Sequence, residues 1–378
     1  MKKVLVLTTS TGEGHNQAAN SISIKFEQAG YKVIKHDFLK NNSKLFAKLF
    51  INGYELSATT FPEIYGYFYK ITNYPIISSL IHKVFYFIRK KLFNIVSKEN
   101  PDIVLVTHPF AVNLAVSIKE EFNIPALVIV TDFKAHGTYI NNKIDGYIVA
   151  SNDTKINLSN RGIDINKIHT FGIPVKDEFF ISRIENLSKC NDYFNILLMS
   201  GSMGLRNISY VLKELLNNKH KLRITIVCGK NENLKHELDE KYNRYIKDKK
   251  IHIIGFSNDI DVLMEYSDLI ISKPGGLTAT EAIAKHLPLL IPFAIPGQEY
   301  ENVEVLTSNG YAIYLDNFIE LNSIIDSFIN DPKELNKIKK NMINLSTLYS
   351  KDKIVNLANK LLERWTYNTL FTGFFIIN

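Results

Sequence analysis

The stretch from Ser272 to Glu281, Ser-Lys-Pro-Gly-Gly-Leu-Thr-Ala-Thr-Glu, has the residue types of an anion-binding turn. An apolar run before it, Leu269–Ile271, predicts a buried parallel strand, and a helix is expected from Thr278 onward. Because Gly275 and Gly276 lack a Cβ, the backbone there can approach a ligand closely. The free N–H groups of the first helical turn point at any anion bound beside them. The pattern therefore predicts a phosphate site.

The same residues also have a purely structural interpretation. Thr278 and Glu281 have the spacing of a capping box, in which two side chains satisfy N–H groups at a helix start. A second polar cluster, formed by Gln298, Glu299 and Asn302, follows a Pro-Gly pair at the start of the next predicted helix. Polar groups at strand ends and helix starts are where open α/β sheets bind ligands. The two clusters together favour a ligand site.

Another glycine-rich turn follows the first apolar run of the chain. Residues 3–8 predict a buried strand, Gln17–Ala29 predict an amphipathic helix, and Gly12-Glu-Gly-His15 lies between them. The two glycines begin a dinucleotide fingerprint, but Gln17 stands where its third small residue belongs, so a nicotinamide or flavin site is not predicted. His15 lies at the mouth of the turn, where an imidazole can act as a general base. A histidine without a chemical role is the alternative.

Two more predicted strands end in polar side chains. The strand Asp102–Thr107 leads to His108. The strand Pro125–Thr131 leads to Asp132, with His136 close behind. Because the carboxyl ends of parallel strands meet at one edge of a sheet, these groups are expected to share a crevice. Asp132 has a second interpretation as a turn-capping residue, and the spacing of these groups is not that of a metal site.

The composition is that of an ordinary globular protein. The chain has 378 residues, of which 46% are hydrophobic and 22% charged. Its only cysteines are Cys190 and Cys228, so no disulfide framework is predicted and a cytoplasmic location is expected. The first apolar run stops after Leu7 and is interpreted as a strand rather than a signal peptide. No apolar run reaches the ~20 residues that span a bilayer.

The stretch from Lys40 to Lys98 concentrates positive charge and aromatic residues. It holds nine Lys or Arg residues and only two Glu, in a chain whose net charge is +7. An apolar helical stripe with flanking basic residues is typical of a helix lying on anionic lipid; the alternative is a helix that simply covers the sheet. Nucleic-acid binding is not predicted, because no recognised module is present. The stripe comprises Ile81, Val84, Ile88, Leu92 and Ile95, and the candidate membrane contacts are Lys83, Phe85, Phe87, Arg89, Lys90 and Lys91.

The later half of the chain begins a new α/β alternation. A strand at Asn195–Met199 leads at once into Ser200-Gly-Ser-Met-Gly204, a small glycine-rich turn suited to a diphosphate. The turn lacks the Gly-Lys-Ser/Thr ending of a P-loop, so a nucleoside triphosphatase is not predicted. Asp259 and Asp261 form a D-x-D pair whose carboxylates could hold a metal ion, but capping of the following helix explains them more simply. No metal is predicted.

Together these segments resemble the GT-B glycosyltransferases, closest to the monogalactosyldiacylglycerol synthase and processive diacylglycerol glucosyltransferase family. The resemblance rests on the Gly-x-Gly-His turn, Thr-Asp-Phe at 131–133, Gly-Ile-Pro-Val at 172–175, and the two polar segments of the later half. It implies an α/β fold of two doubly wound Rossmann-like domains that face each other across a cleft. The expected domains are an acceptor and membrane-facing domain (1–175), a linker (176–192), a UDP-sugar domain (193–355) and a returning helix and tail (356–378).

The resemblance also implies a reaction and its residues. An inverting enzyme would move a hexose from a UDP-sugar to diacylglycerol, with glucose favoured over galactose and no cofactor or metal required. His15 would be the catalytic base, and Asp132 would orient it or bind the acceptor hydroxyl. Glu281 would hold the ribose hydroxyls. The implied donor-binding residues are Gly14, Ser200, Gly201, Ser202, Met203, Gly204, Phe256, Gly275, Gly276, Leu277, Thr278, Glu281, Gln298, Glu299 and Asn302.

The expected partners are the UDP-sugar, diacylglycerol and anionic membrane lipids, at the inner face of the cell membrane. Three alternatives stay open at this point. A UDP-sugar epimerase would use the same donor site without a lipid acceptor, and a transferase of N-acetylglucosamine to a polyprenyl-linked peptidoglycan precursor would differ only in the acceptor. A non-catalytic UDP-sugar-sensing protein would bind without turnover.

Overall fold

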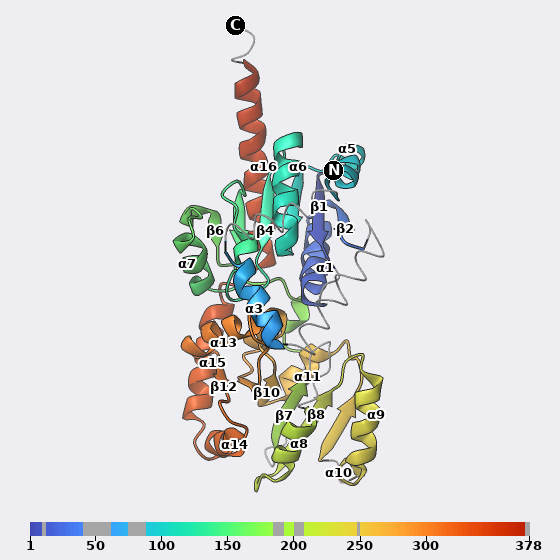
Figure 1. Cartoon of the computed structure of the whole chain (residues 1–378), viewed down its shortest axis with the longest axis vertical. Coiled ribbons are helices and arrows are strands. Elements are labelled where there is room, and N and C mark those ends of the chain that lie inside the picture. The colour runs from blue at the N-terminus through green and yellow to red at the C-terminus, as the bar shows by residue number, and fades with distance from the viewer. Residues whose placement is uncertain are drawn as a thin grey trace. The chain divides into compact units, whose positions relative to one another are not determined.

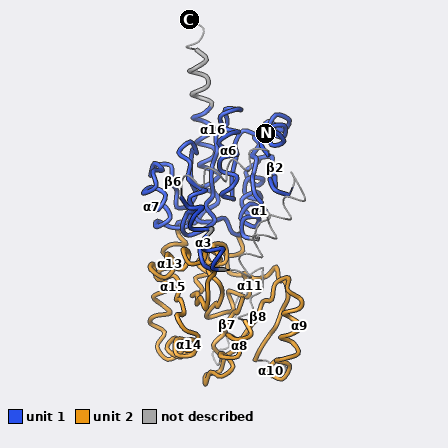
Figure 2. The backbone as a smooth tube through the Cα atoms, in the orientation of Figure 1, with its two compact units in different colours: residues 1–175, 296–298, 348–378 blue, residues 176–295, 299–347 orange. Residues whose placement is uncertain are grey.

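A computed structural model describes residues 1–9, 13–40, 62–74, 88–183, 193–199, 208–247 and 250–374. The chain forms two compact units, shown in different colours in Figure 2. Unit 1 comprises residues 1–175, 296–298 and 348–378, and unit 2 comprises residues 176–295 and 299–347. The chain therefore enters unit 2 at Lys176, inside the stretch expected to be a linker. It returns to unit 1 for residues 296–298 and again from Leu348.

Unit 1 is built on a parallel sheet of six strands in the order β2-β1-β3-β4-β5-β6. Short apolar runs with little polar interruption form such strands because both faces of the sheet are covered. Several strands are two or three residues shorter than predicted, because the chain leaves the sheet earlier to form turns. The strands are β1 (Lys3–Thr8), β2 (Lys32–Asp37), β3 (Ile103–Val106), β4 (Ala126–Ile129), β5 (Gly146–Ile148) and β6 (Ile168–His169).

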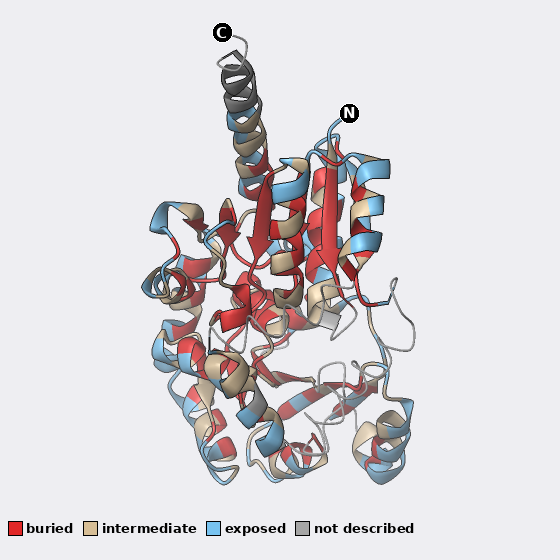
Figure 3. Ribbon diagram, turned by 45° about the horizontal axis from the view of Figure 1, so that its top comes forward, coloured by how far each residue is buried: buried red, intermediate tan, exposed pale blue. Residues whose placement is uncertain are grey.

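Helices cover both faces of this sheet, and the strands β1, β3, β4 and β5 are almost wholly buried (Figure 3), whereas the edge strand β2 is partly exposed. Successive β1 residues point to opposite faces, so Val4 and Val6 join one core while Leu5 and Leu7 join the other. The first core includes α1 (Glu13–Gln28) and the start of α16 (Lys351–Phe374). The second includes α5 (Arg89–Glu99) and α6 (Val112–Phe122). Unit 1 also contains α7 (Asn152–Asn160).

Two of the three described residues of the apolar stripe that was predicted to contact lipid are core residues, and the third, Ile95, is partly buried. Ile88 and Leu92 are fully buried in the second core of unit 1. The lipid interpretation of these residues is wrong, because their apolar side chains are already packed on the sheet. Lys90 and Lys91 are exposed, whereas Arg89 pairs with Glu121 at 3.7 Å. Ile81, Lys83, Val84, Phe85 and Phe87 lie outside the described residues.

Helix α3 (Pro62–Thr72) is attached to unit 1 by polar contacts. His136 Nε2 lies 3.0 Å from the Tyr69 carbonyl oxygen, and His136 Nδ1 accepts from Thr138 N–H at 3.3 Å. Nε2 therefore carries the proton and donates a hydrogen bond to the Tyr69 carbonyl oxygen. Asn73 Oδ1 accepts from the Gly137 N–H at 2.6 Å and from Arg161 Nη2 at 2.8 Å. His136 is thus a structural residue that holds this helix.

Unit 2 contains a second parallel six-stranded sheet, in the order β12-β11-β10-β7-β8-β9. Its strands, labelled in part in Figure 1, are β7 (Phe194–Met199), β8 (Leu222–Val227), β9 (Ile251–Ile254), β10 (Leu269–Ser272), β11 (Leu289–Ile291) and β12 (Ala312–Tyr314). The helices are α8 (Ile208–Leu216), α9 (Glu232–Lys241), α10 (Asn243–Lys247), α11 (Ile260–Tyr266), α12 (Gly276–Ala284), α13 (Gln298–Ser308), α14 (Glu320–Asn330) and α15 (Lys333–Ser346).

The last helix, α16, packs against the first helix of unit 1. The Lys351 ammonium donates to Ser21 Oγ at 3.1 Å, and Ser21 Oγ donates to the Val175 carbonyl at 2.5 Å. Further along α16, Trp365 Nε1 donates to the Asn123 carbonyl at 2.6 Å. None of the helices in the described part of the chain combines the length and apolar composition needed to cross a bilayer.

Candidate active site

Each sheet has one point at which its strand order reverses, and the predicted site residues lie at these two points. In unit 1 the reversal is between β1 and β3, and in unit 2 it is between β7 and β10. On either side of such a point the connecting helices lie on opposite faces of the sheet, which leaves a crevice at the carboxyl ends of the strands. The fold therefore explains why polar side chains follow β3 and β10.

His15 occupies the crevice of unit 1 with a defined orientation. Its Nδ1 lies 2.9 Å from the Thr107 carbonyl oxygen at the end of β3, and 2.8 Å from Thr131 Oγ1 beyond β4. Because a carbonyl oxygen can only accept, Nδ1 carries the proton. The lone pair of the neutral ring is then on Nε2. This is the tautomer that can take a proton from a substrate hydroxyl.

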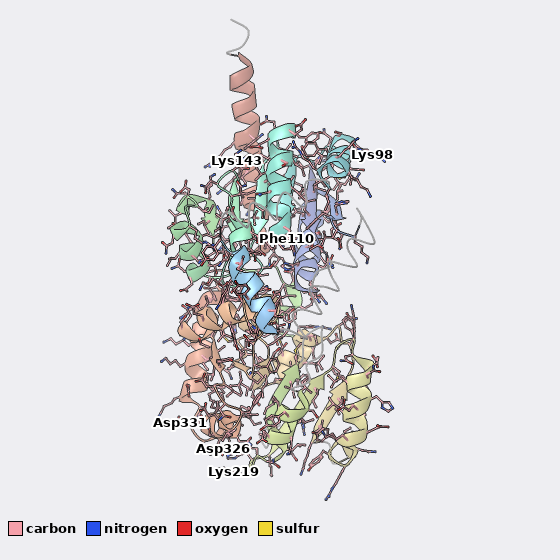
Figure 4. All side chains as sticks on the ribbon, viewed as in Figure 1. Lys98, Phe110, Lys143, Lys219, Asp326 and Asp331 are labelled. Atoms are coloured by element: carbon pink, nitrogen blue, oxygen red, sulfur yellow. The ribbon has the colours of Figure 1, made fainter. Side chains whose placement is uncertain are left out.

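The surroundings of His15 keep the ring neutral. Burial lowers its pKa to about 4, and the hydrogen bond to Thr107 only partly opposes this effect. The ring of His108 meets it edge-on, with centroids 4.5 Å apart. Burial, followed by the neighbouring His15, also holds the pKa of His108 well below its usual range. His108 Nδ1 accepts the N–H of Phe110, a residue labelled in Figure 4, so this nitrogen has a structural task.

Asp132 lies at the same edge of the sheet but does not take the orienting role proposed for it. The orienting partners of His15 are the Thr107 carbonyl and Thr131, as given above. The buried Asp132 carboxylate instead accepts from Gln298 Nε2 at 2.5 Å. Gln298 belongs to unit 1, together with Pro296 and Gly297. The structure therefore places Gln298 beside Asp132.

The crevice of unit 2 contains a helix start without side-chain caps. Helix α12 begins at Gly276, and its N-cap residue is Gly275, for which no side chain provides a capping hydrogen bond. The capping-box interpretation of Thr278 and Glu281 is therefore wrong, because both residues lie inside the helix. A Cβ placed on Gly275 would meet no atom within 4 Å. The N–H groups of this turn have the geometry that favours an anion.

Glu299 and Asn302 hold the turn before α12. Glu299 Oε1 accepts from Lys273 Nζ at 2.8 Å, and its Oε2 accepts from the Ile295 N–H at 2.9 Å. Asn302 Nδ2 donates to the Pro274 carbonyl at 3.0 Å. Both side chains are buried. They fix the backbone of the turn, and the sugar contacts expected of them stay a prediction.

Glu281 lies one turn inside α12, and its side chain is buried. Within the described residues this carboxyl makes no hydrogen bond. Burial raises its pKa to about 8; the positive charge of Lys176 lowers the pKa, and the negative charge of Asp261 raises it. Glu281 is therefore largely protonated at pH 7.

The D-x-D pair is engaged by an arginine. Arg183 Nη1 lies 3.3 Å from Asp259 Oδ1 and 3.1 Å from Asp261 Oδ2. Asp259 stands at the N-cap position of α11 but makes no capping hydrogen bond, so the capping explanation is wrong. Among the described residues no group of three or more His, Cys, Asp or Glu side chains is arranged to hold a metal ion. Metal independence stays a prediction.

The other predicted donor residues are placed only in part. Phe256 follows β9 with 58% of its surface exposed, and the Lys230 ammonium lies 5.8 Å from its ring centre. Gly14 is in the first turn of α1, and Leu277 and Thr278 are half-buried in α12. The diphosphate turn, Ser200, Gly201, Ser202, Met203 and Gly204, lies outside the described residues.

Several residues at these sites were not anticipated from the sequence. Thr107 acts through its carbonyl, which any residue supplies, so no side-chain pattern could have indicated it. Thr131 precedes the predicted Asp132, and its hydroxyl lies 3.0 Å from Tyr139 Oη. Lys273 lies within the predicted turn. Its ion pair with Glu299 could not be predicted, because the two residues meet only in the folded chain. Arg183 lies far along the chain from Asp261.

The sequence matches known families over both halves. Residues 15–175 match the family model of monogalactosyldiacylglycerol (MGDG) synthase, and residues 195–355 match the glycosyltransferase family 28 C-terminal domain. A processive diacylglycerol beta-glucosyltransferase of Staphylococcus epidermidis is 28% identical over 366 residues, which cover 93% of this chain and 91% of the relative. The processive diacylglycerol beta-glucosyltransferase of Bacillus licheniformis is 29% identical over 365 residues, which cover 94% of this chain and 94% of the relative.

Solved structures share the fold at lower identity. MurG of Acinetobacter baumannii has a TM-score of 0.61 and 16% identity, covering 95% of this chain and 100% of MurG. MnaA of S. aureus, solved with UDP, has a TM-score of 0.61 and 14% identity, over 96% of this chain and 97% of MnaA. HepE of Anabaena, solved with UDP-glucose, has a TM-score of 0.56 and 13% identity, and the match covers 96% of this chain and 100% of HepE. This likeness concerns the fold alone.

Proposed function

The chain belongs to the GT-B glycosyltransferases of the MGDG synthase and processive diacylglycerol glucosyltransferase family, and from that premise we propose that it transfers glucose from UDP-glucose to diacylglycerol with inversion at the sugar. The observation that carries the chemistry is the orientation of His15. Its Nδ1–H is directed at Thr107, so Nε2 presents a lone pair. A neutral imidazole in this tautomer is suited to deprotonating an alcohol.

The proposed step is a single displacement. His15 Nε2 accepts the proton of the acceptor hydroxyl, and the acceptor oxygen forms a bond to C1 of the sugar. The bond from C1 to the diphosphate oxygen breaks, and UDP leaves with the electron pair. The configuration at C1 is inverted because attack and departure are on opposite faces. Protonated His15 then returns its proton to solvent.

The departing diphosphate needs stabilisation of its developing charge. The uncapped N–H groups at Gly276 and the next residues of α12 are fixed dipoles that point toward such a charge. Lys273, Glu299 and Asn302 hold this turn in place through the contacts described above. In the proposed reaction Glu281 binds the ribose hydroxyls, and no metal ion is required.

We also propose that unit 1 contacts the surface of an anionic membrane through α3. Ile64 and Tyr67 of α3 are exposed, Tyr67 with 66% of its surface, and so is Tyr74, just beyond the end of the helix. Aromatic side chains favour the headgroup level of a bilayer. Lys70 of α3, and Lys90 and Lys91 of α5, supply exposed positive charge for anionic lipid. A diacylglycerol acceptor is found only at such a surface.

The test is transfer of labelled sugar by the purified chain to vesicles that contain diacylglycerol, with EDTA present. Labelled glucosyl-diacylglycerol from UDP-glucose, and its loss in the His15→Asn variant, is the expected result. Preferential use of UDP-galactose would correct the donor. Isomerised UDP-sugar without an acceptor would indicate an epimerase, and transfer only to a polyprenyl-linked precursor would change the acceptor. Activity that disappears with EDTA and returns with a divalent cation would contradict metal independence.

A further inference from the structure

A short segment of unit 1, Pro296–Gln298, is held by helix α3 and by Asp132. The segment belongs to unit 1, whereas the residues on either side of it in the chain belong to unit 2. Pro296 and Gly297 form a turn, and Gln298 is the first residue of α13. Because the sequence predicts Gln298 as a donor-binding residue, the contacts that fix this turn also fix a predicted donor contact.

Gly66 lets the middle of α3 approach this turn closely. Gly66 is buried, and a Cβ placed on it would lie 2.6 Å from Pro296 Cβ and 3.3 Å from the Pro296 carbonyl carbon. A glycine inside a helix costs about 0.5–1 kcal/mol relative to alanine. Helix α3 therefore gives up stability at this position, and the close packing on Pro296 supplies the reason.

Gly297 meets the same helix at Tyr69. Its φ is +100°, a conformation that residues with a Cβ rarely adopt, and a Cβ there would lie 2.9 Å from Tyr69 Cγ. Gly66 and Tyr69 have the i, i+3 spacing of residues that share a helix face. The turn thus packs on one face of α3, and a side chain at either glycine would push the turn and the helix apart.

The segment after β4 fixes α3 itself. His136 donates to the Tyr69 carbonyl, as described above, and the rings of His136 and Tyr69 have centroids 4.5 Å apart. Arg161 Nη2 donates to the Asn73 carbonyl oxygen at 3.0 Å, and Arg161 Nη1 donates to the Ala135 carbonyl oxygen at 2.9 Å. The position of Tyr69 against Gly297 is therefore set by contacts on its far side.

Asp132, in the same segment after β4, fixes the side chain of Gln298. The Asp132 carboxylate is buried and accepts from Gln298 Nε2 at 2.5 Å. A carboxylate oxygen accepts and an amide nitrogen donates, so this contact sets which end of the Gln298 amide faces Asp132. The segment after β4 thus holds Gln298 in two ways, at its amide through Asp132 and at its backbone through α3.

We propose that Gly66, Tyr69 and Asp132 are positioning residues of the donor site, which hold Gln298 in place to contact the hexose of the UDP-sugar. The inference rests on the proposed function for the ligand, whereas the packing of α3 on the turn does not depend on it. It assigns Asp132 to the sugar rather than to the catalytic base. UDP has no hexose, so a disturbed Gln298 should affect the binding of UDP-glucose and not that of UDP.

The test measures UDP-glucose and UDP binding by calorimetry for the wild-type chain, Gly66→Ala and Glu63→Ala, without lipid. Gly66→Ala should weaken UDP-glucose binding about three- to tenfold, the equivalent of one lost hydrogen bond, and leave UDP binding unchanged. Glu63→Ala is the control, because Glu63 is exposed on the same helix. Equal weakening of both ligands by Gly66→Ala would indicate a general structural effect and overturn the inference, as would unchanged UDP-glucose binding.

Two further variants locate the cause. Pro296→Gly removes the Cβ that a side chain at Gly66 would meet, so Gly66→Ala should add little further loss in that background. A full additional loss would show that the contact with Pro296 is not the cause. Asp132→Leu should weaken UDP-glucose binding and spare UDP, whereas Asp132→Asn, which keeps an acceptor oxygen, should bind UDP-glucose more tightly than Asp132→Leu.

A second readout needs no ligand. The side-chain NH₂ signals of Gln298 are followed by NMR in ¹⁵N-labelled protein, with Gln298→Ala to assign them. Gly66→Ala and Asp132→Leu should shift these signals, and Glu63→Ala should not. Signals that stay in place in Gly66→Ala would overturn the inference. If the wild-type chain binds neither UDP nor UDP-glucose while the signals shift as expected, the proposed function and the donor role fail together, and the positioning of Gln298 stands.

Discussion

The Thr107 carbonyl oxygen lies 2.9 Å from Nδ1 of His15, and this contact fixes which nitrogen of the ring is basic. The end of β3 and the start of α1 are far apart in sequence and meet at the point where the strand order reverses. A main-chain acceptor at this position holds the imidazole without adding charge.

The first prediction concerns the pH dependence of kcat/KM. Because burial lowers the pKa of His15 to about 4, the base is neutral from pH 6 upward, and protonation of His15 should lower activity only as the pH approaches 4. An acid limb with its midpoint near 6.5 would contradict the assignment. His15→Asn should lower turnover by about 10²–10⁴-fold without changing UDP affinity. His252→Asn is a matched control, since this histidine is exposed on β9.

The second prediction concerns stability between pH 6.5 and 8. Glu281 has a pKa of about 8 in the folded chain and 4.5 as its ordinary value, so the folded state binds the extra proton. Stability is lost as pH rises through this window, by up to about 1.4 kcal/mol per pH unit. His15 and His136, with pKa values lowered to about 4, act in the opposite direction but only below 6.5.

Glu281→Gln should therefore flatten the decline of the urea midpoint above pH 6.5. In the acid range, His15→Asn should reduce the gain in stability that accompanies rising pH. A Glu281→Gln curve parallel to that of the wild-type chain would show that this carboxyl does not titrate in the window.

The third prediction concerns the ion pair between Lys273 and Glu299. Lys273→Met leaves the buried Glu299 carboxylate without its cation, and breaking such a pair costs about 3 kcal/mol. Lys333→Met is the control, because Lys333 pairs at the surface with Asp331, a residue labelled in Figure 4. An exposed pair contributes about 0–1 kcal/mol. Urea denaturation that gives equal losses of unfolding free energy for Lys273→Met and Lys333→Met would contradict a buried role for Lys273.

The fourth prediction compares two glycines with similar backbone angles. Gly172 has a φ of +83° and Gly162 a φ of +91°. Gly162→Ala should lower the free energy of unfolding by about 1 kcal/mol, which is the cost of a left-handed backbone at alanine. No atom lies within 4 Å of the new Cβ, so no clash is added. Gly172→Ala would place its Cβ 2.4 Å from the Tyr349 ring, so a larger loss is expected. The double variant Gly172→Ala/Tyr349→Ala should recover part of the added loss; no recovery would exclude this clash as its cause.

The fifth prediction tests the exposed face of α3. Ile64→Ser/Tyr67→Ser should weaken sedimentation of the chain with phosphatidylglycerol vesicles and lower glycolipid formation, because apolar and aromatic area at the interface is lost. Activity toward a water-soluble acceptor should not change. Tyr210→Ser is a matched control, since Tyr210 is an exposed aromatic residue of unit 2. Undiminished vesicle binding in the α3 variant would place the contact elsewhere.

The sequence by itself determined the family, the α/β class and most elements of the chain. Apolar runs that end in glycine or polar residues require strands followed by turns, so β1, β3, β4, β7 and β10 were predicted with small errors at their ends. The types and spacing around His15 and Gly275 indicated a base and an anion site, because both depend on local sequence. The family prediction is confirmed by the matches over both halves.

Tertiary structure alone decided what each polar side chain contacts. The orienting partners of His15 come from β3 and the segment after β4, and one of them is a main-chain carbonyl that has no sequence signature. The stripe at Ile88 and Leu92 suited lipid and core equally by periodicity, and packing on the sheet placed it in the core. Asp261 was interpreted as a cap until the fold brought Arg183 to it. Such pairings depend on long-range packing, which local periodicity does not encode.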